Sequence, residues 1–263
     1  MISGEIARKW WWDSVTEHVL IPSAGLPIAD VVCVASDDCT QEFQHATLVS
    51  PAVGGVVAVV GAIRDKWKAL GGDRVMGEPY QAQTCGLVGG GCSQAFWRGT
   101  AYWSAASGAH FVSPVISPAW LALKGVTGTL GYPTSDPFCG LVRAGCGQQF
   151  QNGSIYWSSA TGAHAVRGAI RAEYAALHWE NNLGYPTTEQ FCGLVGGGCG
   201  QHFQNGSIYW SPKSGAHQIR GAIYKAWAAS GWEHGRYGYP TGEPTPVAGG
   251  RFTQAFQHGR LTA

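Results

Sequence analysis

Apolar and polar positions along the chain recur with a period of about 53 residues. The tripeptide Gly-Ala-Ile at 61–63 returns at 168–170 and 221–223, with Pro-Val-Ile at 114–116 and Gly-Glu-Ile at 4–6. Each of these starts leads into a short amphipathic stretch that ends near a Trp or Tyr. This pattern predicts five repeated units that each begin with a helix of about three turns.

A Gly-Pro turn and a group of short strands follow each predicted helix. The turn reads Leu-Gly-Tyr-Pro at 130–133 and 183–186. After a Cys-flanked, Gly-rich loop comes Phe-Gln-Asn-Gly-Ser-Ile-Tyr-Trp at 150–157, where Asn-Gly between alternating residues is a strong hairpin signal. With Asn-Gly as the two turn residues, Phe150 would face Ile155. A third strand is expected at 163–167.

One unit is therefore predicted to be a short helix plus a three-stranded meander, which makes the fold class α+β. A unit of this size cannot bury its own apolar face, so neighbouring units must share a core. We predict a single domain of residues 1–263, with repeats at about 4–60, 61–113, 114–167, 168–220 and 221–263.

The two ends of the chain indicate how the row of units closes. Alignment of the fifth unit on the fourth places Phe256 on Phe203 and Ala263 on Trp210, so the fifth unit lacks its third strand. Residues 1–3 stand directly before the first helix start, where each later unit has that strand. We predict that they complete the last repeat and close a ring, which removes an exposed sheet edge.

Composition narrows the range of partners. The formal net charge is +1 and charged residues make up 13% of the chain, which leaves no basic surface for nucleic acid. No run approaches the roughly 20 apolar residues that span a bilayer. The first thirty residues lack the pattern of a signal peptide, so either export is not needed or a signal has been removed.

The eight cysteines fall into four pairs at equivalent places, one in each of the first four units. The pairs are Cys33 with Cys39, Cys85 with Cys92, Cys139 with Cys146, and Cys192 with Cys199. A pair inside one turn-rich loop suits a local disulfide in an oxidising compartment, and this favours a removed signal. Zinc is the competing interpretation, but no pair has the spacing of two to four residues usual for a zinc site. We predict four disulfides and no metal.

The motifs of the fourth unit make the chain similar to a known family. Leu-Gly-Tyr-Pro at 183–186, Phe-Gln-Asn-Gly-Ser-Ile-Tyr-Trp-Ser at 203–211, Gly-Ala-His at 215–217 and Gly-Ala-Ile at 221–223 together resemble the LGFP repeat. LGFP repeats occur in exported actinobacterial proteins, commonly appended to cell-wall enzymes such as mycoloyltransferases and peptidoglycan amidases. The resemblance implies an extracellular, cell-wall-associated body with pseudo-fivefold symmetry that holds its protein to arabinogalactan and needs no cofactor.

Side chains that recur from unit to unit are the candidate ligand-binding residues. They are Tyr132, Tyr185 and Tyr239 in the turns, Trp103, Trp157, Trp210, Gln94, Gln148 and Gln201 on the strands, His110, His164 and His217 near the third strand, and Asp136 and Glu189 after the turn proline. A turn Tyr in a loop offers an exposed ring for stacking on a sugar. The acids could accept hydrogen bonds from sugar hydroxyls, or could be solvated or cap a turn.

Each strand candidate also has a structural interpretation. The Trp positions share a face with core residues, which favours packing. A buried amide that satisfies backbone groups explains the recurring Gln as well as a polar sugar site does. A repeated His is more often a structural hydrogen-bonding group than a ligand group. The Trp and His positions are filled together only in units two to four, so we predict at most three sites, each weak and combined through avidity.

An enzyme and a passive spacer are the rival functions. No acid differs from its equivalents in the other units, as a catalytic acid should, and the chain has no Gly-x-Ser-x-Gly elbow, His-Glu-x-x-His motif or Walker loop. We therefore expect a non-catalytic, monomeric module that binds cell-wall polysaccharide. A glycan or ester hydrolase of the cell envelope and a structural protein-interaction spacer remain the alternatives.

Overall fold

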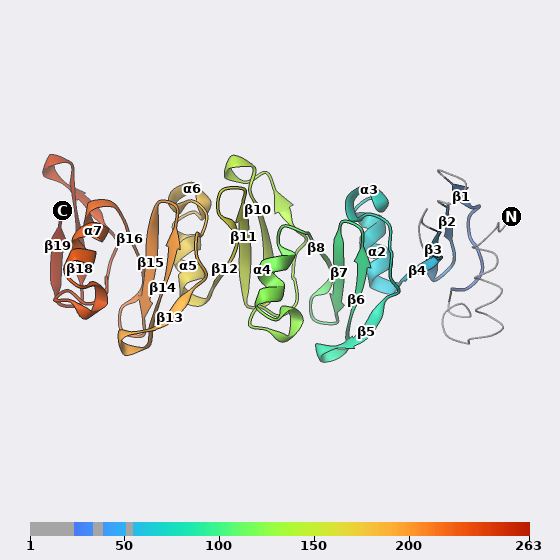
Figure 1. Ribbon diagram of the computed structural model, residues 1–263, viewed down its shortest axis with the longest axis horizontal. Helices are drawn as coiled ribbons and strands as arrows, with labels where there is room; N and C mark the ends of the chain where they lie inside the picture. The colour runs from blue at the N-terminus through green and yellow to red at the C-terminus, as the bar shows by residue number, and fades with distance from the viewer. Residues whose placement is uncertain (1–23, 34–38, 51–54) are drawn as a thin grey trace. The chain divides into compact units, whose positions relative to one another are not determined.

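The computed structural model describes residues 24–33, 39–50 and 55–263 (Figure 1). Contacts divide the chain into two compact units, one from the described part of Met1–Ser117 together with Gly125–Pro137, the other from Pro118–Lys124 and Phe138–Ala263. The predicted strand at residues 1–3 lies outside the described residues. Within these residues no helix is long and apolar enough to cross a membrane.

The first compact unit carries two antiparallel sheets of four strands each, and in both of them the strands pair in chain order. One consists of β1 (Val32–Cys33), β2 (Cys39–Glu42), β3 (Ala46–Ser50) and β4 (Val57–Val60), and the other of β5 (Thr84–Leu87), β6 (Gly91–Phe96), β7 (Gly99–Ser104) and β8 (Gly108–Val112).

The second compact unit carries three more sheets of the same kind. They are β9 (Phe138–Cys139), β10 (Cys146–Phe150), β11 (Gly153–Ser158) and β12 (Gly162–Arg167); β13 (Phe191–Leu194), β14 (Gly198–Phe203), β15 (Gly206–Ser211) and β16 (Gly215–Ile219); and β17 (Thr245–Val247), β18 (Arg251–Phe256) and β19 (Gly259–Thr262). Each of the five sheets that the structure describes has one strand more than predicted, namely four where three were expected and three in the fifth, which was expected to supply only two. The additional strand is the short segment that enters the Cys loop.

Short helices join the sheets at the predicted starts. They are α2 (Gly61–Ala69), α4 (Ser117–Ala122), α5 (Gly168–Ala176) and α7 (Gly221–Ala229), with the single turns α3 (Asp73–Met76) and α6 (Glu180–Leu183) before the Gly-Pro turn. The recurring Gly of Gly-Ala-Ile has φ values of +56° at Gly61, +58° at Gly168 and +60° at Gly221. This left-handed bend between strand and helix explains why Gly recurs there.

Three core clusters of the described residues each lie between one sheet and the next, with the helix between them. In the second compact unit, Val166 of β12 packs with Ile170 and Tyr174 of α5 and with Phe203 and Ile208 of the following sheet. Residues four apart on a helix share a face, which places Ile170 and Tyr174 together in this core. The core is therefore shared between neighbouring repeats, as the small size of one repeat predicts.

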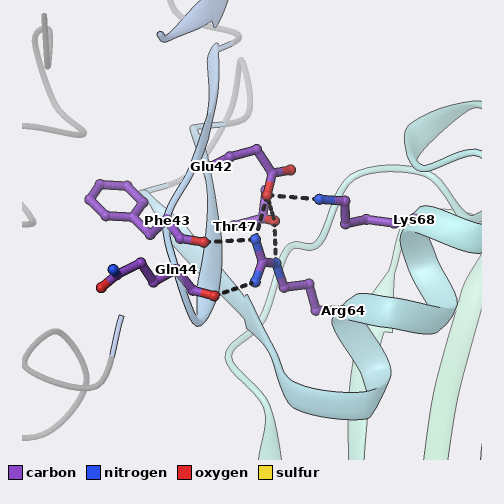
Figure 2. Close-up of polar contacts among 6 residues, drawn as sticks. All are labelled: Glu42, Phe43, Gln44, Thr47, Arg64 and Lys68. Atoms are coloured by element: carbon purple, nitrogen blue, oxygen red, sulfur yellow. Dashed lines mark hydrogen bonds and ion pairs between the residues drawn. The ribbon is translucent and has the colours of Figure 1, made fainter. Parts of the chain in front are cut away.

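The helix is also tied to the hairpin of the sheet before it. Figure 2 shows Arg64 of α2 donating hydrogen bonds to Thr47 Oγ1 and to the carbonyl oxygen of Phe43, both at 2.8 Å, while it forms an ion pair with Glu42. Burial alone would raise the pKa of Glu42, but hydrogen bonds from Arg64 and Lys68 outweigh burial and lower it. The guanidinium thus fixes the angle between helix and hairpin.

The same contact recurs in the second compact unit with different residues. Arg171 of α5 donates to Ser154 Oγ and to Gln149 Oε1, both at 2.6 Å. An arginine three residues after the recurring Gly therefore has a structural role in both places.

The hairpin register differs from the predicted one. Phe150 stands opposite Gly153 and Gln148 opposite Ile155, so the turn residues are Gln151 and Asn152. The Asn-Gly signal assumes a type I′ turn with positive φ at both central residues, and neither of the two turn residues has one. A Gly directly after the turn is instead typical of type I.

Candidate functional site

The four predicted disulfides are confirmed. Cys33–Cys39, Cys85–Cys92, Cys139–Cys146 and Cys192–Cys199 are bonded, and no free cysteine remains among the described residues. In each case the two cysteines face each other across the first two strands of a sheet. The last three bonds each close a loop whose tip is a single helical turn, at Val88–Gly90, Val142–Ala144 and Val195–Gly197.

The turn tyrosines do not have the exposed rings that their loop position predicts. Tyr132, Tyr185 and Tyr239 are all buried. Their hydroxyl groups donate hydrogen bonds to backbone carbonyl oxygens in the preceding Cys loop, at 2.7 Å from Tyr132 to Val88, 2.7 Å from Tyr185 to Val142 and 2.8 Å from Tyr239 to Val195. The stacking prediction is wrong because a tertiary contact with the previous repeat covers the ring.

A glycine makes room for each of these rings. A Cβ at Gly198 would lie 2.2 Å from the Tyr239 hydroxyl oxygen, and one at Gly145 would lie 2.1 Å from that of Tyr185. Burial raises the pKa of Tyr239 to about 12, with a further contribution from Glu233, so the phenol is a hydrogen-bond donor at neutral pH.

The strand glutamines are buried and bonded to backbone. Gln94, Gln148 and Gln201 are at most 1% exposed. The Gln201 Nε2 donates to Ala165 O at 2.8 Å and to Thr188 O at 2.9 Å, and Gln94 makes the equivalent pair of bonds. For Gln94 and Gln201 the structural interpretation therefore accounts for the position, since each amide joins the last strand of one sheet to the turn of the next.

The strand tryptophans are partly buried beside the disulfides. Trp103, Trp157 and Trp210 stand directly opposite Cys92, Cys146 and Cys199. Trp103 and Trp210 each pack against the core cluster that contains the facing cysteine. Packing explains these two rings, while their partial exposure leaves one surface accessible to solvent.

Each recurring histidine faces the acid that follows the turn proline of the next repeat. The Nδ1–oxygen distances are 3.6 Å for His110 and Asp136, 3.1 Å for His164 and Glu189, and 2.9 Å for His217 and Glu243. The Nε2 atom of each ring lies 2.8–3.0 Å from the carbonyl oxygen three residues earlier. Sequence analysis treated the histidines and the acids as separate ligand candidates, whereas in the structure each histidine contacts an acid of the next repeat.

The helix brings a different charged side chain to the histidine–acid pair in different repeats. Burial would raise the pKa of Asp136, but the adjacent His110 ring and hydrogen bonds from Lys66 and the Phe111 backbone outweigh burial and hold it at about 2. At the last link, Glu173 of α5 occupies the helix position of Lys66. Burial, together with the neighbouring Glu243, raises the pKa of Glu173 to about 7. Sequence reasoning missed Glu173, although the alignment of the helices contains the Lys-to-Glu exchange.

Stability should fall as the pH rises from about 5 to 8, because of Glu173 and His217. A carboxyl whose pKa is higher in the folded state than its ordinary 4.5 is stabilising when protonated and destabilising once ionised. The hydrogen bond to Glu243 also raises the pKa of His217, so its contribution is present at low pH and is lost on deprotonation. Urea unfolding should show that Glu173→Gln is about 1 kcal/mol more stable than wild type at pH 8, and not at pH 5.

Glu173→Lys is the matched control, because it recreates the ion pair of Lys66 with Asp136, whose Nζ–Oδ2 distance is 2.7 Å. It should also be more stable than wild type at pH 8. Equal pH dependence in wild type and both variants would contradict this account.

Signature residues from several motifs meet in one groove of the second compact unit. Its volume is about 570 Å3, and Tyr239 forms part of its wall. The other lining residues are Val195 and Gly196 of the Cys loop, Ser211 at the end of β15, Pro212 and Lys213 of the β15–β16 turn, Thr241 of the next turn, and Gln257 and His258 of the β18–β19 turn. Lys213, Thr241 and His258 are exposed. Of the predicted site residues, only Tyr239 lines this groove.

The contacts that shape this groove recur one repeat earlier. Gln257 Oε1 accepts a hydrogen bond from the Tyr239 backbone N at 3.1 Å, and Gln204 Oε1 accepts one from Tyr185 N at 3.0 Å. In both places the tyrosine hydroxyl also donates a hydrogen bond to the Cys loop. The turn, the hairpin tip and the Cys loop are therefore joined in the same way at Tyr185 and at Tyr239, and we call this arrangement a frame. Sequence analysis missed the groove because it forms only where turns of neighbouring repeats pack together, which the sequence of one repeat does not indicate.

Small antiparallel sheets that alternate with short helices and share their cores define a repeat module. The LGFP repeat model matches residues 25–74, 76–128, 130–182 and 183–235, and the chain belongs to the LGFP repeat family. LGFP repeats are cell-wall-associated repeat modules. The family model finds four repeats where five were predicted, because each match begins near the Gly-Pro turn and the last ends before β17.

Other comparisons add little. No curated protein matches the chain. Among solved structures, selenomethionine-substituted virginiamycin B lyase from Staphylococcus aureus is similar over 92% of this chain and 70% of its own, at 7% identity and a TM-score of 0.16. That likeness supports no inference about fold or function.

Proposed function

We propose that this chain is a non-catalytic module that attaches its protein to cell-wall polysaccharide, with arabinogalactan as the ligand. The groove beside Tyr239 is the observation that carries this proposal. Its walls are fixed by hydrogen bonds and its exposed groups, an ammonium, a hydroxyl and an imidazole, are suited to sugar hydroxyls. Pockets of 300–1,000 Å3 with a few polar groups are typical ligand sites.

Several weak sites acting together would give useful affinity. Two frames of the same construction occur in the second compact unit, at Tyr185 and at Tyr239. A polymer that engages more than one site gains apparent affinity through effective concentration, by a hundredfold or more when the spacing permits. Cell-wall location agrees with the four disulfides, which persist in oxidising compartments outside the cell.

The remaining predicted ligand residues have a supporting role in this proposal. His164, His217, Glu189 and the buried glutamines hold the repeats in register, and the exposed surfaces of Trp157 and Trp210 extend the contact area beside the grooves. Monomeric structure and closure of five units about a pseudo-fivefold axis are also part of the proposal. In the described residues β19 has no further strand beside it, whereas β3, β7, β11 and β15 are each paired on both sides.

The pair Glu173 and Glu243 is the feature that a hydrolase would use. Burial, together with the neighbouring Glu243, raises the pKa of Glu173, as for the general acid of an acid–base pair. Glu243 Oε1, however, already lies 2.9 Å from His217 Nδ1 in the link between repeats, so this acid has a structural partner. We therefore favour a binding module over a glycosidase, which needs two carboxyl groups about 5–10 Å apart around the scissile bond.

Removal of exposed groove groups should weaken retention on insoluble arabinogalactan. We expect Lys213→Ala and His258→Ala each to lower the affinity about fivefold, since one hydrogen bond contributes about 1 kcal/mol. Lys225→Ala is the control, because Lys225 is another exposed lysine, on α7, that does not line this groove. A pull-down with quantification of bound protein measures the change.

The same pull-down separates the three classes of function. Release of soluble sugar from the wall would indicate an enzyme, and absence of retention would indicate a spacer. Retention that is unaffected by both groove variants would place the sugar site elsewhere on the molecule.

A further inference from the structure

In each of the three sheets before the fifth, a disulfide lies beside a strand tryptophan, and the fifth sheet has other residues at these positions. In those sheets a cysteine of the second strand faces Trp103, Trp157 or Trp210. In the fifth sheet Phe252 faces Ala263, joined by backbone hydrogen bonds of 2.9 and 3.0 Å in the two directions. Pro246 takes the place of the other cysteine, because it pairs with Phe252.

This exchange leaves a cavity. A space of about 430 Å3 lies against Ala263, Phe252, Pro244 and Ile223. In the preceding repeat Trp210, the equivalent of Ala263, packs against the core cluster that contains Cys199 and Ile170, which are the equivalents of Phe252 and Ile223. The cavity therefore occupies the place that an indole ring fills one repeat earlier.

The lining combines an apolar floor with cationic groups. Arg220 and Arg251 both line the cavity, and no Asp or Glu is present among its described lining residues. The Arg220 Nη1 donates to Asn182 Oδ1 at 2.9 Å, which holds this guanidinium in place. Arg251 is exposed. A planar ring on the apolar floor would bring an attached anion to guanidinium groups that bind carboxylates well.

We propose that this cavity is a binding site for a planar aromatic ring that carries a carboxylate. This site shares no lining residue with the sugar groove. The ligand could be a free aromatic acid or the C-terminal Trp of a peptide, since both present the same ring and anion.

The test is titration of the full chain with indole-3-acetate, followed by NMR. The signals of Phe252 and Ala263 should shift with saturable binding, and uncharged indole should bind at least fivefold more weakly. Ala263→Trp should abolish binding, because the new side chain fills the cavity as Trp210 does one repeat earlier. Arg251→Gln should weaken indole-3-acetate severalfold and leave indole unchanged, and this exposed position keeps the test independent of core folding.

A second arm distinguishes the two sources. A short peptide that ends in Trp is compared with its C-terminal amide, which should bind more weakly, and with indole-3-acetate. Tighter binding of the peptide acid than of indole-3-acetate indicates a peptide ligand, and the reverse order indicates a free aromatic acid. Failure of both indole-3-acetate and the peptide to bind at millimolar concentration would overturn the proposal. Binding that persists in Ala263→Trp would overturn it too. Neither result bears on arabinogalactan retention, which the groove variants test separately.

Discussion

Tyr185→Ala is expected to lower the free energy of unfolding by about 3–5 kcal/mol. The ring is 1% exposed within the core shared by β11, α5 and the following sheet, and its hydroxyl bonds the Val142 carbonyl. Truncation leaves a cavity the size of an aromatic ring and removes one of the two hydrogen bonds to the Val142 carbonyl oxygen, the other being that from Gly145 N at 3.3 Å. Urea unfolding followed by tryptophan fluorescence measures the loss.

Tyr185→Phe is the matched control because it keeps the ring and removes only the hydroxyl. Its expected cost is about 1 kcal/mol, that of one hydrogen bond. If the Ala variant is as stable as the Phe variant, the ring is not the packing element described above. A loss of sugar binding in Tyr185→Ala would therefore report on folding and would not identify a stacking residue.

Loss of the Cys192–Cys199 disulfide is expected to destabilise the chain by about 2–3 kcal/mol in the Cys192→Ser/Cys199→Ser double variant. The estimate follows from the entropy of closing a loop with a sequence separation of 7 residues in the unfolded chain. The loop also contains the Val195 carbonyl, so its release would loosen the wall of the sugar groove. Denaturant unfolding of the oxidised variant and wild type gives the difference.

The equivalent double variant at Cys85 and Cys92 is the control. Its loop has the same separation, 7 residues, so its cost in stability should be similar. The sugar groove lies at a different repeat, so binding through it should be unchanged. A destabilisation below about 0.5 kcal/mol in both variants would show that the loops are held by other contacts.

Local sequence patterns were sufficient for the repeat, the helix starts and the disulfides. Gly168 and Gly221 recur because the strand-to-helix bend requires a positive φ, and each cysteine pair lies inside one loop. These features depend on residues close together in the chain. Their physical causes are therefore visible in the sequence.

Features that depend on distant residues could not be predicted. Tyr239 was expected to be exposed because it stands in a turn, but the loop that covers it is 44 residues earlier. The first strand of each described sheet has only two to four residues, too few for the alternation that indicates a strand. The groove and the role of Glu173 depend on how one repeat packs on the next, for which the sequence of a single repeat contains no signal.

The hydrogen bond from each turn tyrosine to the preceding Cys loop has a directional consequence. The loop at Val142 is completed by Tyr185, and the loop at Val195 by Tyr239. Each of these two loops thus depends on the C-terminal neighbour of its own repeat for one contact, and not the reverse. Loss of whole repeats is then asymmetric: loss of the segment that carries Tyr239 leaves the loop at Val195 without its tyrosine contact, whereas loss of the segment before Cys139 leaves both of these contacts in place.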